Sequence, residues 1–253
     1  MNPLDTPVTV LSGVGDAKAK LFAKLRISTL YDAVRHFPRD YEDRTVMRFT
    51  AQLEHGESVC VAATVEDATM TRSANGLMLV KARAHDDYGA LDLYFFNQPY
   101  ARDALRRGET YIFFGKVERE TRTPRMVNPV FERYTETRQG TRTRCIVPVY
   151  RLTSGLSQYA VSTAVRAALT RLRDKLPDPT PPYIAERYDL VPAQYAYEQI
   201  HFPQDFDTLA AARRRLIFDE LLTVAAAAQR SRLMRERVLG RRFADTDLAA
   251  FFG

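Results

Sequence analysis

The 253-residue sequence predicts an α+β protein in which a small β-barrel is flanked along the chain by helical segments. Residues 57–134 alternate apolar and polar side chains with a period of two, which is typical of strands. Residues 11–37, 157–172 and 207–240 instead carry apolar side chains at helical spacing. We therefore expect an N-terminal segment that resembles a helical hairpin at residues 1–50, the barrel at residues 51–135 and a helical region at residues 136–253.

The N-terminal segment predicts two short helices within residues 11–45. Gly13 and Gly15 permit a tight turn whose free amides, together with the N-terminus of the next helix, can bind an anion. This pattern resembles the second half of a helix-hairpin-helix module, which grips DNA phosphates without reading sequence. Pro3 and Pro7 break the stretch where a complete module has its first helix, so a purely structural turn is an equally good interpretation. The expected buried stripe is Leu21, Phe22, Leu25 and Ile27, and the Phe37-Pro38 pair is expected to end the second helix.

The barrel segment contains signals for five strands in a defined order. Three strands come first, with an Asn75-Gly76 hairpin signal between the first two. A helical stretch at residues 99–107 and two further strands follow. This is the order of an OB-fold, a five-stranded Greek-key barrel that often binds single-stranded nucleic acid. The expected strands cover residues 59–65, 77–84, 91–96, 110–117 and 126–131.

The third expected strand lies in LDLYFFNQPY, residues 91–100, and ends in two adjacent phenylalanines. Its parity places Phe95 on the core face and Phe96 on the polar face. Tyr100 follows four residues after Phe96, at the start of the helical stretch. Two exposed rings at this spacing can stack on nucleobases. A loop packed over one end of the barrel explains an exposed ring equally well.

The charge of the chain favours a polyanionic partner, because the net charge is +6 and the pI is near 9.4. Most of the 37 basic residues are arginines, whose planar fork suits phosphate. Each basic residue of the barrel is also compatible with an ordinary solvated surface charge. The candidates for a groove that tracks phosphates are Arg72, Arg83, Lys116, Arg119 and Arg122, with Arg125 in the same region.

In the C-terminal region, Ser157 is expected to cap a helix that runs to about Leu172, followed by a cluster of prolines at residues 177–182. The longest helical candidate covers residues 207–240. Its pattern predicts a buried apolar stripe surrounded by arginines. Such a basic helix can track a DNA backbone, but we favour a helix whose arginines face solvent or a partner. The stripe is Leu209, Leu216, Ile217, Leu221, Val224 and Ala228, and the arginines are Arg213, Arg214, Arg215, Arg230, Arg232, Arg235 and Arg237.

Several classes of function lack their sequence signals. No apolar run approaches the roughly 20 residues of a membrane span, and the N-terminus lacks a signal-peptide pattern, so we expect a cytosolic protein without a membrane partner. Cys60 and Cys145 support neither a disulfide framework nor a thiolate metal site. The chain has no G-x-x-x-x-G-K-[ST] phosphate loop and no nucleophile elbow. We expect no catalytic centre, cofactor or metal in this chain, because its histidines also lack ligand spacing: His36, His55, His85 and His201.

Several segments, read in order, connect the chain to a known family. They are LSGVGDAKAKLFAKLRISTLYDAVRHFPRDYEDRT, LDLYFFNQPY, GKVE followed by NPVFERY, PVYRLTSGLSQ, QIHFP and RRLIFDELL. With these segments, which reach from residue 11 to about residue 229, the sequence resembles the N-terminal part of RecG, a family of ATP-dependent helicases that remodel stalled replication forks and branched DNA. The resemblance implies a wedge domain at the junction, in which Phe96 and Tyr100 stack on exposed bases and Phe95 is a helper.

The same resemblance implies branched DNA as the partner, meaning forks and Holliday junctions in recombination and repair. It also implies motor domains that bind ATP and Mg²⁺ and begin shortly after the position where this chain stops. We therefore expect a fragment or a truncated product that binds DNA without translocating on it. A single-stranded DNA-binding protein is a further expected partner, and the expected location is the bacterial cytoplasm, in association with the nucleoid.

Three other interpretations stay open. The first is a stand-alone OB-fold protein that binds junctions or single strands and recruits a separate motor, like the RuvA type, whose modules come in the opposite order. The second is a nuclease or ligase fragment, which needs a metal cluster or a nucleophilic lysine that the sequence does not show. The third is a tRNA-binding OB module.

Overall fold

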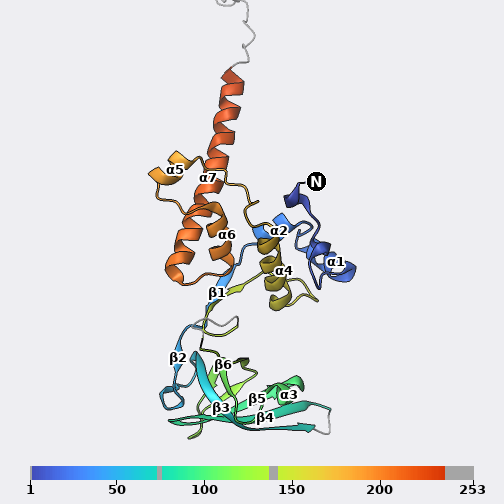
Figure 1. Cartoon of the computed structure of the whole chain (residues 1–253), viewed down its shortest axis with the longest axis vertical. Coiled ribbons are helices and arrows are strands. Elements are labelled where there is room, and N and C mark those ends of the chain that lie inside the picture. Colours follow the sequence, from blue (N-terminus) through green and yellow to red (C-terminus); the bar gives the residue numbers. More distant parts are fainter. Residues whose placement is uncertain (1, 73–75, 137–141, 237–253) are drawn as a thin grey trace, which may run out of the picture.

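The structure is a computed structural model that describes residues 2–72, 76–136 and 142–236. A β-barrel lies at one end of the molecule and a group of helices at the other, with a small two-stranded sheet between them (Figure 1). The middle of the sequence forms the barrel, and the segments before and after it form the helical group. The chain therefore leaves the helices, completes the barrel and returns to the helices.

Five strands close the barrel in the order β3, β4, β5, β7, β6, because β6 pairs back onto β3. Neighbouring strands are antiparallel except β5 and β7, which run parallel. Helix α3 (Tyr100–Ala104) follows β5 in the sequence. This is the topology of an OB-fold, so the predicted fold class is confirmed. The strands are β3 (Ser58–Arg72), β4 (Met78–Asp86), β5 (Gly89–Phe96), β6 (Thr110–Glu118) and β7 (Arg125–Val127).

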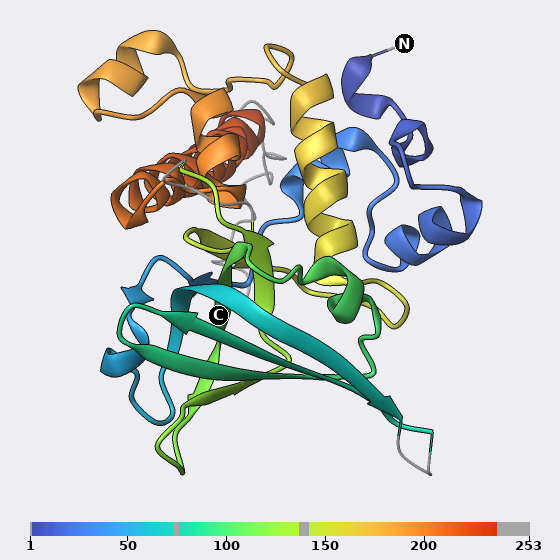
Figure 2. The ribbon, with the colours of Figure 1, turned by 60° about the horizontal axis from the view of Figure 1, so that its bottom comes forward.

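Alternate residues of these strands fill the barrel core. On β5, Leu91, Leu93 and Phe95 each have no exposed surface, as the period-two pattern predicts. Ala101 of α3 and Leu105, which follows the helix, join the same core. The helix is thus fixed to the barrel near the end of β5, and Figure 2 shows it beside the strands.

The last strand of the barrel differs from the prediction. The sequence predicts one strand at residues 126–131, whereas the structure has two, β7 and β8 (Val130–Arg133). The break falls at Asn128, whose φ of 48° lies in the left-handed region, and at Pro129, which has no N–H to donate to a neighbouring strand. As a result β7 pairs with both β5 and β6, and β8 pairs with β6.

Besides β8, the described residues form three short strands outside the barrel, and these have no clear signal in the sequence because none exceeds four residues. Strand β2 (Met47–Arg48) runs parallel to β3, and β1 (Asp40–Asp43) pairs antiparallel with β9 (Ile146–Val149). The β1–β9 pair joins the chain just before the barrel to the chain just after it. Gly76 has a φ of 78°, which fits the hairpin signal, whereas Asn75 lies outside the described residues.

The helices on both sides of the barrel segment share one core. Phe22 of α1, Val34 of α2 and Val165 of α4 are buried in the same cluster, which also contains Ile27. The two predicted N-terminal helices are confirmed, and two 3₁₀ turns precede them where a complete hairpin module has a helix. The expected boundaries after residues 50 and 135 stay predictions. The elements are η1 (Pro3–Asp5), η2 (Val8–Val10), α1 (Asp16–Lys24), α2 (Leu30–Arg35) and α4 (Gln158–Arg171), with a further turn, η3 (Thr50–Gln52), beside the barrel.

The ends of these helices follow their local sequence. The Thr29 hydroxyl accepts the Asp32 N–H at 3.1 Å and the Asp32 carboxylate accepts the Thr29 N–H at 2.9 Å, which completes a capping box at the start of α2. That helix ends before the Phe37-Pro38 pair, as predicted. The Ser157 hydroxyl accepts the Ala160 N–H at 3.2 Å, so the predicted cap of α4 is also confirmed.

Helix α7 (Phe206–Glu236) follows α5 (Pro182–Arg187) and α6 (Ala193–His201) and projects beyond the other helices (Figure 1). Leu209 is 2% exposed, so its predicted burial is confirmed, and it packs against α6. Leu216 is half-buried and packs against the same cluster. The prediction is wrong for Ile217, Leu221 and Val224, which are 56%, 63% and 62% exposed, and for Ala228, which is also exposed. The cause is the length of α6, which has nine residues and covers only the first turns of α7. None of the helices within the described ranges is long and apolar enough to cross a membrane.

The arginines at the start of α7 bind the protein itself. Arg215 has no exposed surface, and its guanidinium donates to the Asp219 carboxylate at 3.0 Å and to the Val191 carbonyl at 2.7 Å. The same group forms an ion pair with Asp178. Arg215 therefore neither tracks a DNA backbone nor faces solvent or a partner, so neither alternative given for these arginines holds for it. Arg213 lies over the Tyr41 ring and Arg214 donates to the Tyr188 carbonyl, whereas Arg237 and the side chain of Arg235 lie outside the described part.

Candidate nucleic-acid interface

The end of strand β5 separates two adjacent rings onto opposite faces. Phe95 has no exposed surface and meets the Phe131 ring edge to face, with the centroids 5.6 Å apart. Phe96 is 38% exposed on the outer face of the barrel. The parity prediction for both residues is confirmed. The helper role expected for Phe95 does not fit this packing, because the ring cannot contact a base without leaving the core.

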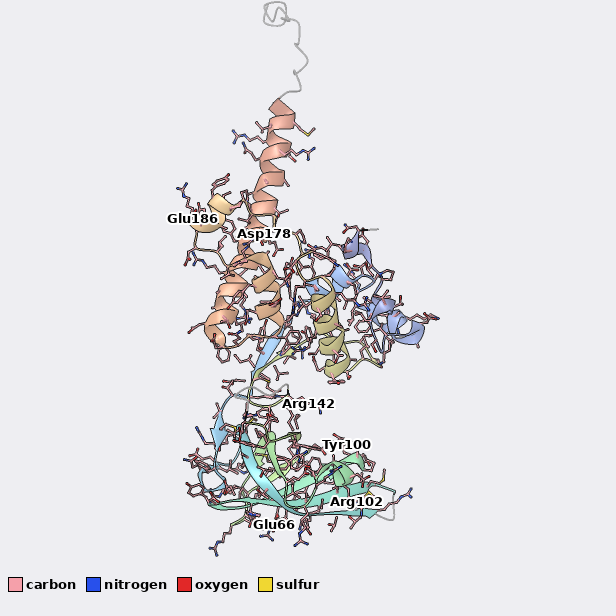
Figure 3. All side chains as sticks on the ribbon, viewed as in Figure 1. Glu66, Tyr100, Arg102, Arg142, Asp178 and Glu186 are labelled. Carbon is pink, nitrogen blue, oxygen red and sulfur yellow. The ribbon has the colours of Figure 1, made fainter. Side chains whose placement is uncertain are left out.

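Tyr100 is the second exposed ring and opens helix α3. Its ring stacks on that of Phe131 with the centroids 6.3 Å apart and an angle of 18° between the planes. Phe131 is half-buried against the core, so it supports Tyr100 from the barrel side. Tyr100 nevertheless keeps 59% of its surface exposed, and Figure 3 shows it at the side of the barrel. One face of the ring is thus supported and much of the rest is open to a ligand.

A hydrogen-bond network connects the two exposed rings. The Asn128 side-chain oxygen accepts the Phe96 backbone N–H at 2.8 Å and the Gln98 side-chain N–H at 3.2 Å. The Gln98 side-chain oxygen in turn accepts the Tyr100 hydroxyl at 2.7 Å. Asn128 is itself fixed, because its backbone N–H donates to the Tyr94 carbonyl at 2.7 Å. The positions of both rings are therefore coupled through two amide side chains.

Neither Gln98 nor Asn128 stands out as a functional residue in the sequence. Asn128 lies 30 residues after Gln98, and the contact depends on the parallel pairing of β5 with β7. The available signal was indirect: Gln98 lies in FFNQPY and Asn128 in NPVFERY, two of the segments that resemble RecG. The structure brings these two segments together.

The basic residues expected to line one groove do not lie together, as the positions of Arg72 and Lys116 show. Arg72 lies at the end of β3 where Thr71 is in register with Leu79, and Leu79 with Phe96. Lys116 lies opposite Ser58, at the other end of β3. Fourteen steps along a strand correspond to about 45 Å, so Arg72 and Lys116 cannot line one short groove.

The remaining basic residues of the barrel are exposed or bound to neighbours. Arg122 is exposed in the loop between β6 and β7. The Arg119 guanidinium donates to the Leu53 carbonyl at 2.7 Å, so it holds this loop in place. The other two are bound to carboxylates, with Arg83 3.7 Å from Glu66 and Arg125 bound to Glu118 and Glu120. Phosphate contacts by all these residues stay predictions.

The glycine turn lies in the helical group, away from the rings of the barrel. Gly13 has a φ of 78°, a conformation that favours glycine, and Gly15 is the residue before α1. A cavity of about 330 Å³ separates this turn from the start of α4, and Lys18 and Tyr159 line it. Phosphate contact by Gly13 and Gly15 also stays a prediction.

Other kinds of site find little support in the described part of the chain. No group of three or more His, Cys, Asp or Glu side chains there could hold a metal ion. His201 is buried and accepts the Tyr150 hydroxyl at 3.0 Å through Nδ1, since Nε2 donates to the Val34 carbonyl at 2.7 Å. Burial lowers its pKa to about 4, so it is neutral at pH 7 and has a structural role.

A family model and several known proteins are similar to this chain. The RecG wedge domain model matches residues 7–172. The ATP-dependent DNA helicase RecG of Thermotoga maritima is 31% identical over 92% of this chain and 30% of its own length. The protein of the same name from Synechocystis sp. is 29% identical over 86% of this chain and 28% of its own length.

A solved structure of RecG bound to a three-way DNA junction superposes on this chain with a TM-score of 0.82 at 31% sequence identity. The superposition covers 92% of this chain and 32% of that one. This chain thus spans about a third of the length of the relatives that it matches.

Proposed function

This chain belongs to the RecG wedge-domain family, and we propose that it binds branched DNA as the wedge of a RecG-type ATP-dependent helicase in recombination and repair. The proposed ligands are replication forks and Holliday junctions. The solved relative with a TM-score of 0.82 is bound to a three-way DNA junction, which supports this ligand class. The observation that carries the proposal is the pair of exposed rings, Phe96 and Tyr100, connected by Gln98 and Asn128.

The physical reason for branch recognition is the stacking of bases. In continuous duplex each base pair has a stacking neighbour on both sides, whereas the last pair of each arm at a branch lacks one. A fixed aromatic ring can replace the missing neighbour, and stacking on a protein ring contributes about 1 to 3 kcal/mol per base. Phe96 and Tyr100 would therefore favour a branch over linear duplex whatever the sequence of the DNA.

The test compares ligands for the purified chain. Fluorescence anisotropy would measure the dissociation constants of a fork, a Holliday junction, a linear duplex and a structured RNA of equal length. We expect both branched DNAs to bind at least about tenfold more tightly than linear duplex. Tighter binding of the RNA would favour a tRNA-binding module, and equal binding of fork and duplex would contradict the proposal.

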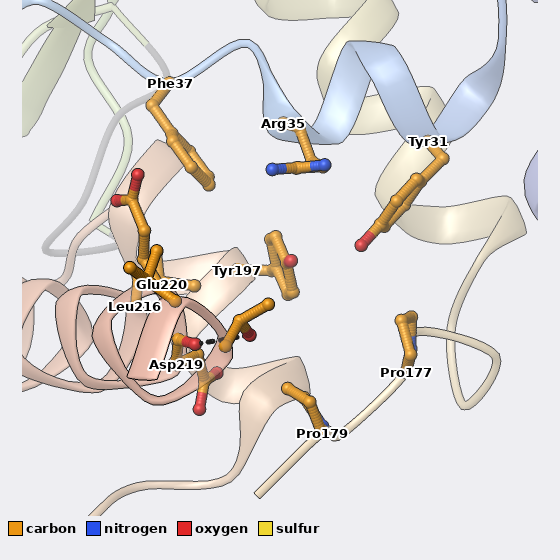
Figure 4. Close-up of a pocket in the computed structure, with 11 residues that line it drawn as sticks. Tyr31, Arg35, Phe37, Pro177, Pro179, Tyr197, Leu216, Asp219 and Glu220 are labelled. Atoms are coloured by element: carbon orange, nitrogen blue, oxygen red, sulfur yellow. Dashed lines mark hydrogen bonds between the residues drawn. The ribbon is translucent and has the colours of Figure 1, made fainter. Parts of the chain in front are cut away.

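We also propose that the motor domains of the parent helicase contact helix α7. The apolar face of Ile217, Leu221 and Val224 is exposed and has the spacing of one helix face. Val224 of this face also lines a pocket of about 540 Å³, and Figure 4 shows the rings of Tyr31 and Tyr197 around that pocket. We assign ATP and Mg²⁺ to those motor domains, because this sequence has no phosphate loop.

Two further assignments complete the proposal. A single-stranded DNA-binding protein is a proposed partner, since unpaired strands occur at the same branches. The proposed location is the bacterial cytoplasm, in association with the nucleoid, because the similar helicases come from bacteria and the proposed ligand is chromosomal DNA.

A further inference from the structure

The outer face of β3, β4 and β5 carries side chains in rows that cross the three strands. Directly opposed residues of antiparallel strands share a face of the sheet. Because Phe96 is exposed, the residues in register with it also lie on the outer face. The first row is Thr71, Leu79 and Phe96, the second is Thr69, Lys81 and Tyr94, and the third is Asp67, Arg83 and Asp92.

The first two rows combine the groups that bind an unpaired strand. Phe96 is exposed and Tyr94 is half-buried. The Lys81 ammonium lies over the Tyr94 ring, 5.6 Å from its centre. Strand geometry places successive residues of one face about 7 Å apart, which sets the spacing of the two rings. Thr69 and Thr71 add exposed threonine side chains on the neighbouring strand.

The local charge also suits a phosphate backbone. The sequence contains no Asp or Glu between Asp67 and Asp86, although 27% of the whole chain is charged. The same stretch contains Lys81 in the second row and Arg83 in the third, whereas Arg72 is in register with Met78 and has the parity of the opposite face. These strands lie at the end of the molecule opposite the helices (Figure 1). The first two rows therefore carry the positive charge of Lys81 and no acidic side chain.

The third row marks the limit of this surface. Asp67 and Asp92 are acidic, and Arg83 is 3.7 Å from the Glu66 carboxylate. Glu66 also lies 3.2 Å from His85. A phosphate backbone that continued past the second row would meet the carboxylates of Glu66, Asp67 and Asp92. Of these, Glu66 is paired with Arg83 and His85. Contact should therefore be confined to the first two rows.

We propose that these two rows form a platform for the first two or three nucleotides of an unpaired strand as it leaves the branch. This inference rests on the proposed function, since Phe96 belongs to both surfaces. The first base stacks at Phe96. Lys81 moves from the Tyr94 ring to the phosphate that follows this base, and the next base stacks at Tyr94. An unpaired strand fits better than a duplex arm, because bases inside a duplex have no free face for these rings.

The experiment varies the length of one unpaired arm of a fork through 0, 1, 2, 3 and 6 nucleotides and measures the affinity for each. The affinity of the wild-type chain for the fork should rise as the unpaired arm grows to two or three nucleotides. A longer unpaired arm should give no further rise. In Tyr94→Leu/Lys81→Gln this gain should fall by at least about fivefold, while the affinity for a fully paired junction is unchanged. Tyr183→Leu/Lys175→Gln is the matched control, because both side chains are exposed and lie in the helical group.

A second variant keeps the test valid if Tyr94→Leu unfolds. Thr71→Glu places a carboxylate on the exposed first row and should reduce the same gain. The platform is overturned if either folded variant retains the full gain, if the gain keeps growing to six nucleotides, or if both variants weaken fully paired junctions equally. If the wild-type chain shows no preference for branched over linear DNA, the proposed function itself fails, which is a separate outcome.

Discussion

The side chain of Asn128 holds the backbone of Phe96, since its oxygen accepts the Phe96 N–H at 2.8 Å. Asn128 is not part of β5, and its φ of 48° turns the chain between β7 and β8 so that the side chain reaches the end of β5. The same oxygen accepts Gln98, which binds the Tyr100 hydroxyl. A residue that is distant in sequence thus sets the geometry of both exposed rings.

Asn128→Gly tests this relationship, because glycine accepts the positive φ but has no side-chain oxygen. We expect fork affinity to fall by about three- to tenfold, equivalent to roughly one hydrogen bond, with little change in the melting temperature. Asp189→Gly is the matched control, since Asp189 also has a positive φ, 49°, but lies in the helical group. If the fork affinity of Asn128→Gly equals that of wild type, the network does not position the rings.

The second prediction concerns salt. Each phosphate contact releases counterions, and two contacts alone predict about a tenfold loss of affinity between 50 and 200 mM salt. We expect at least this loss for fork DNA, measured as the slope of log affinity against log salt. A change of less than about threefold would mean that the basic residues of the barrel bind few phosphates.

The third prediction concerns pH and His201. Its pKa is lowered to about 4 by burial, below the ordinary value of 6.5 that it regains on unfolding. As the pH falls, His201 therefore takes up a proton in the unfolded state before it does so in the folded state. The contribution of neutral His201 to the free energy of unfolding is fully present above pH 6.5 and is lost between pH 6.5 and 4. The loss is about 3 kcal/mol. The nearby titratable groups are Tyr150 and His36, and burial also lowers the pKa of His36, which adds to the loss with the same sign.

Urea unfolding of wild type and His201→Asn at pH 7 and pH 5 checks this prediction. The free energy of unfolding should fall with pH in the wild type and change less in the variant. Equal falls in both proteins would assign the pH dependence to other groups.

The fourth prediction concerns Arg215, which bonds to carboxylates on two different segments. Arg215→Met leaves Asp219 and Asp178 without their shared cation, so we expect the free energy of unfolding to fall by about 3 kcal/mol. Arg214→Met is the matched control, because Arg214 is exposed and adjacent in sequence. A loss of equal size in both variants would contradict a special role for the buried guanidinium.

The sequence was sufficient to predict features that depend on local pattern. The alternation of apolar and polar residues along the strand assigned Phe95 and Phe96 to opposite faces, and the order of strands predicted the OB-fold. It was insufficient where a long-range contact decides the outcome. Asn128 binds Phe96 through a parallel strand pairing that no local pattern shows, and the helical stripe of α7 does not reveal that α6 covers only Leu209 and its neighbours.

The double variant Phe96→Ala/Tyr100→Ala tests most directly whether the two rings recognise the branch. Both rings are exposed, so the variant should fold, and its fork affinity should fall by about ten- to several-hundredfold while linear duplex affinity is nearly unchanged. Phe95→Ala is the control for a buried ring and should instead lower the free energy of unfolding by about 3 to 5 kcal/mol. Equal losses on fork and duplex, or an unfolded double variant, would contradict recognition of the branch by these rings.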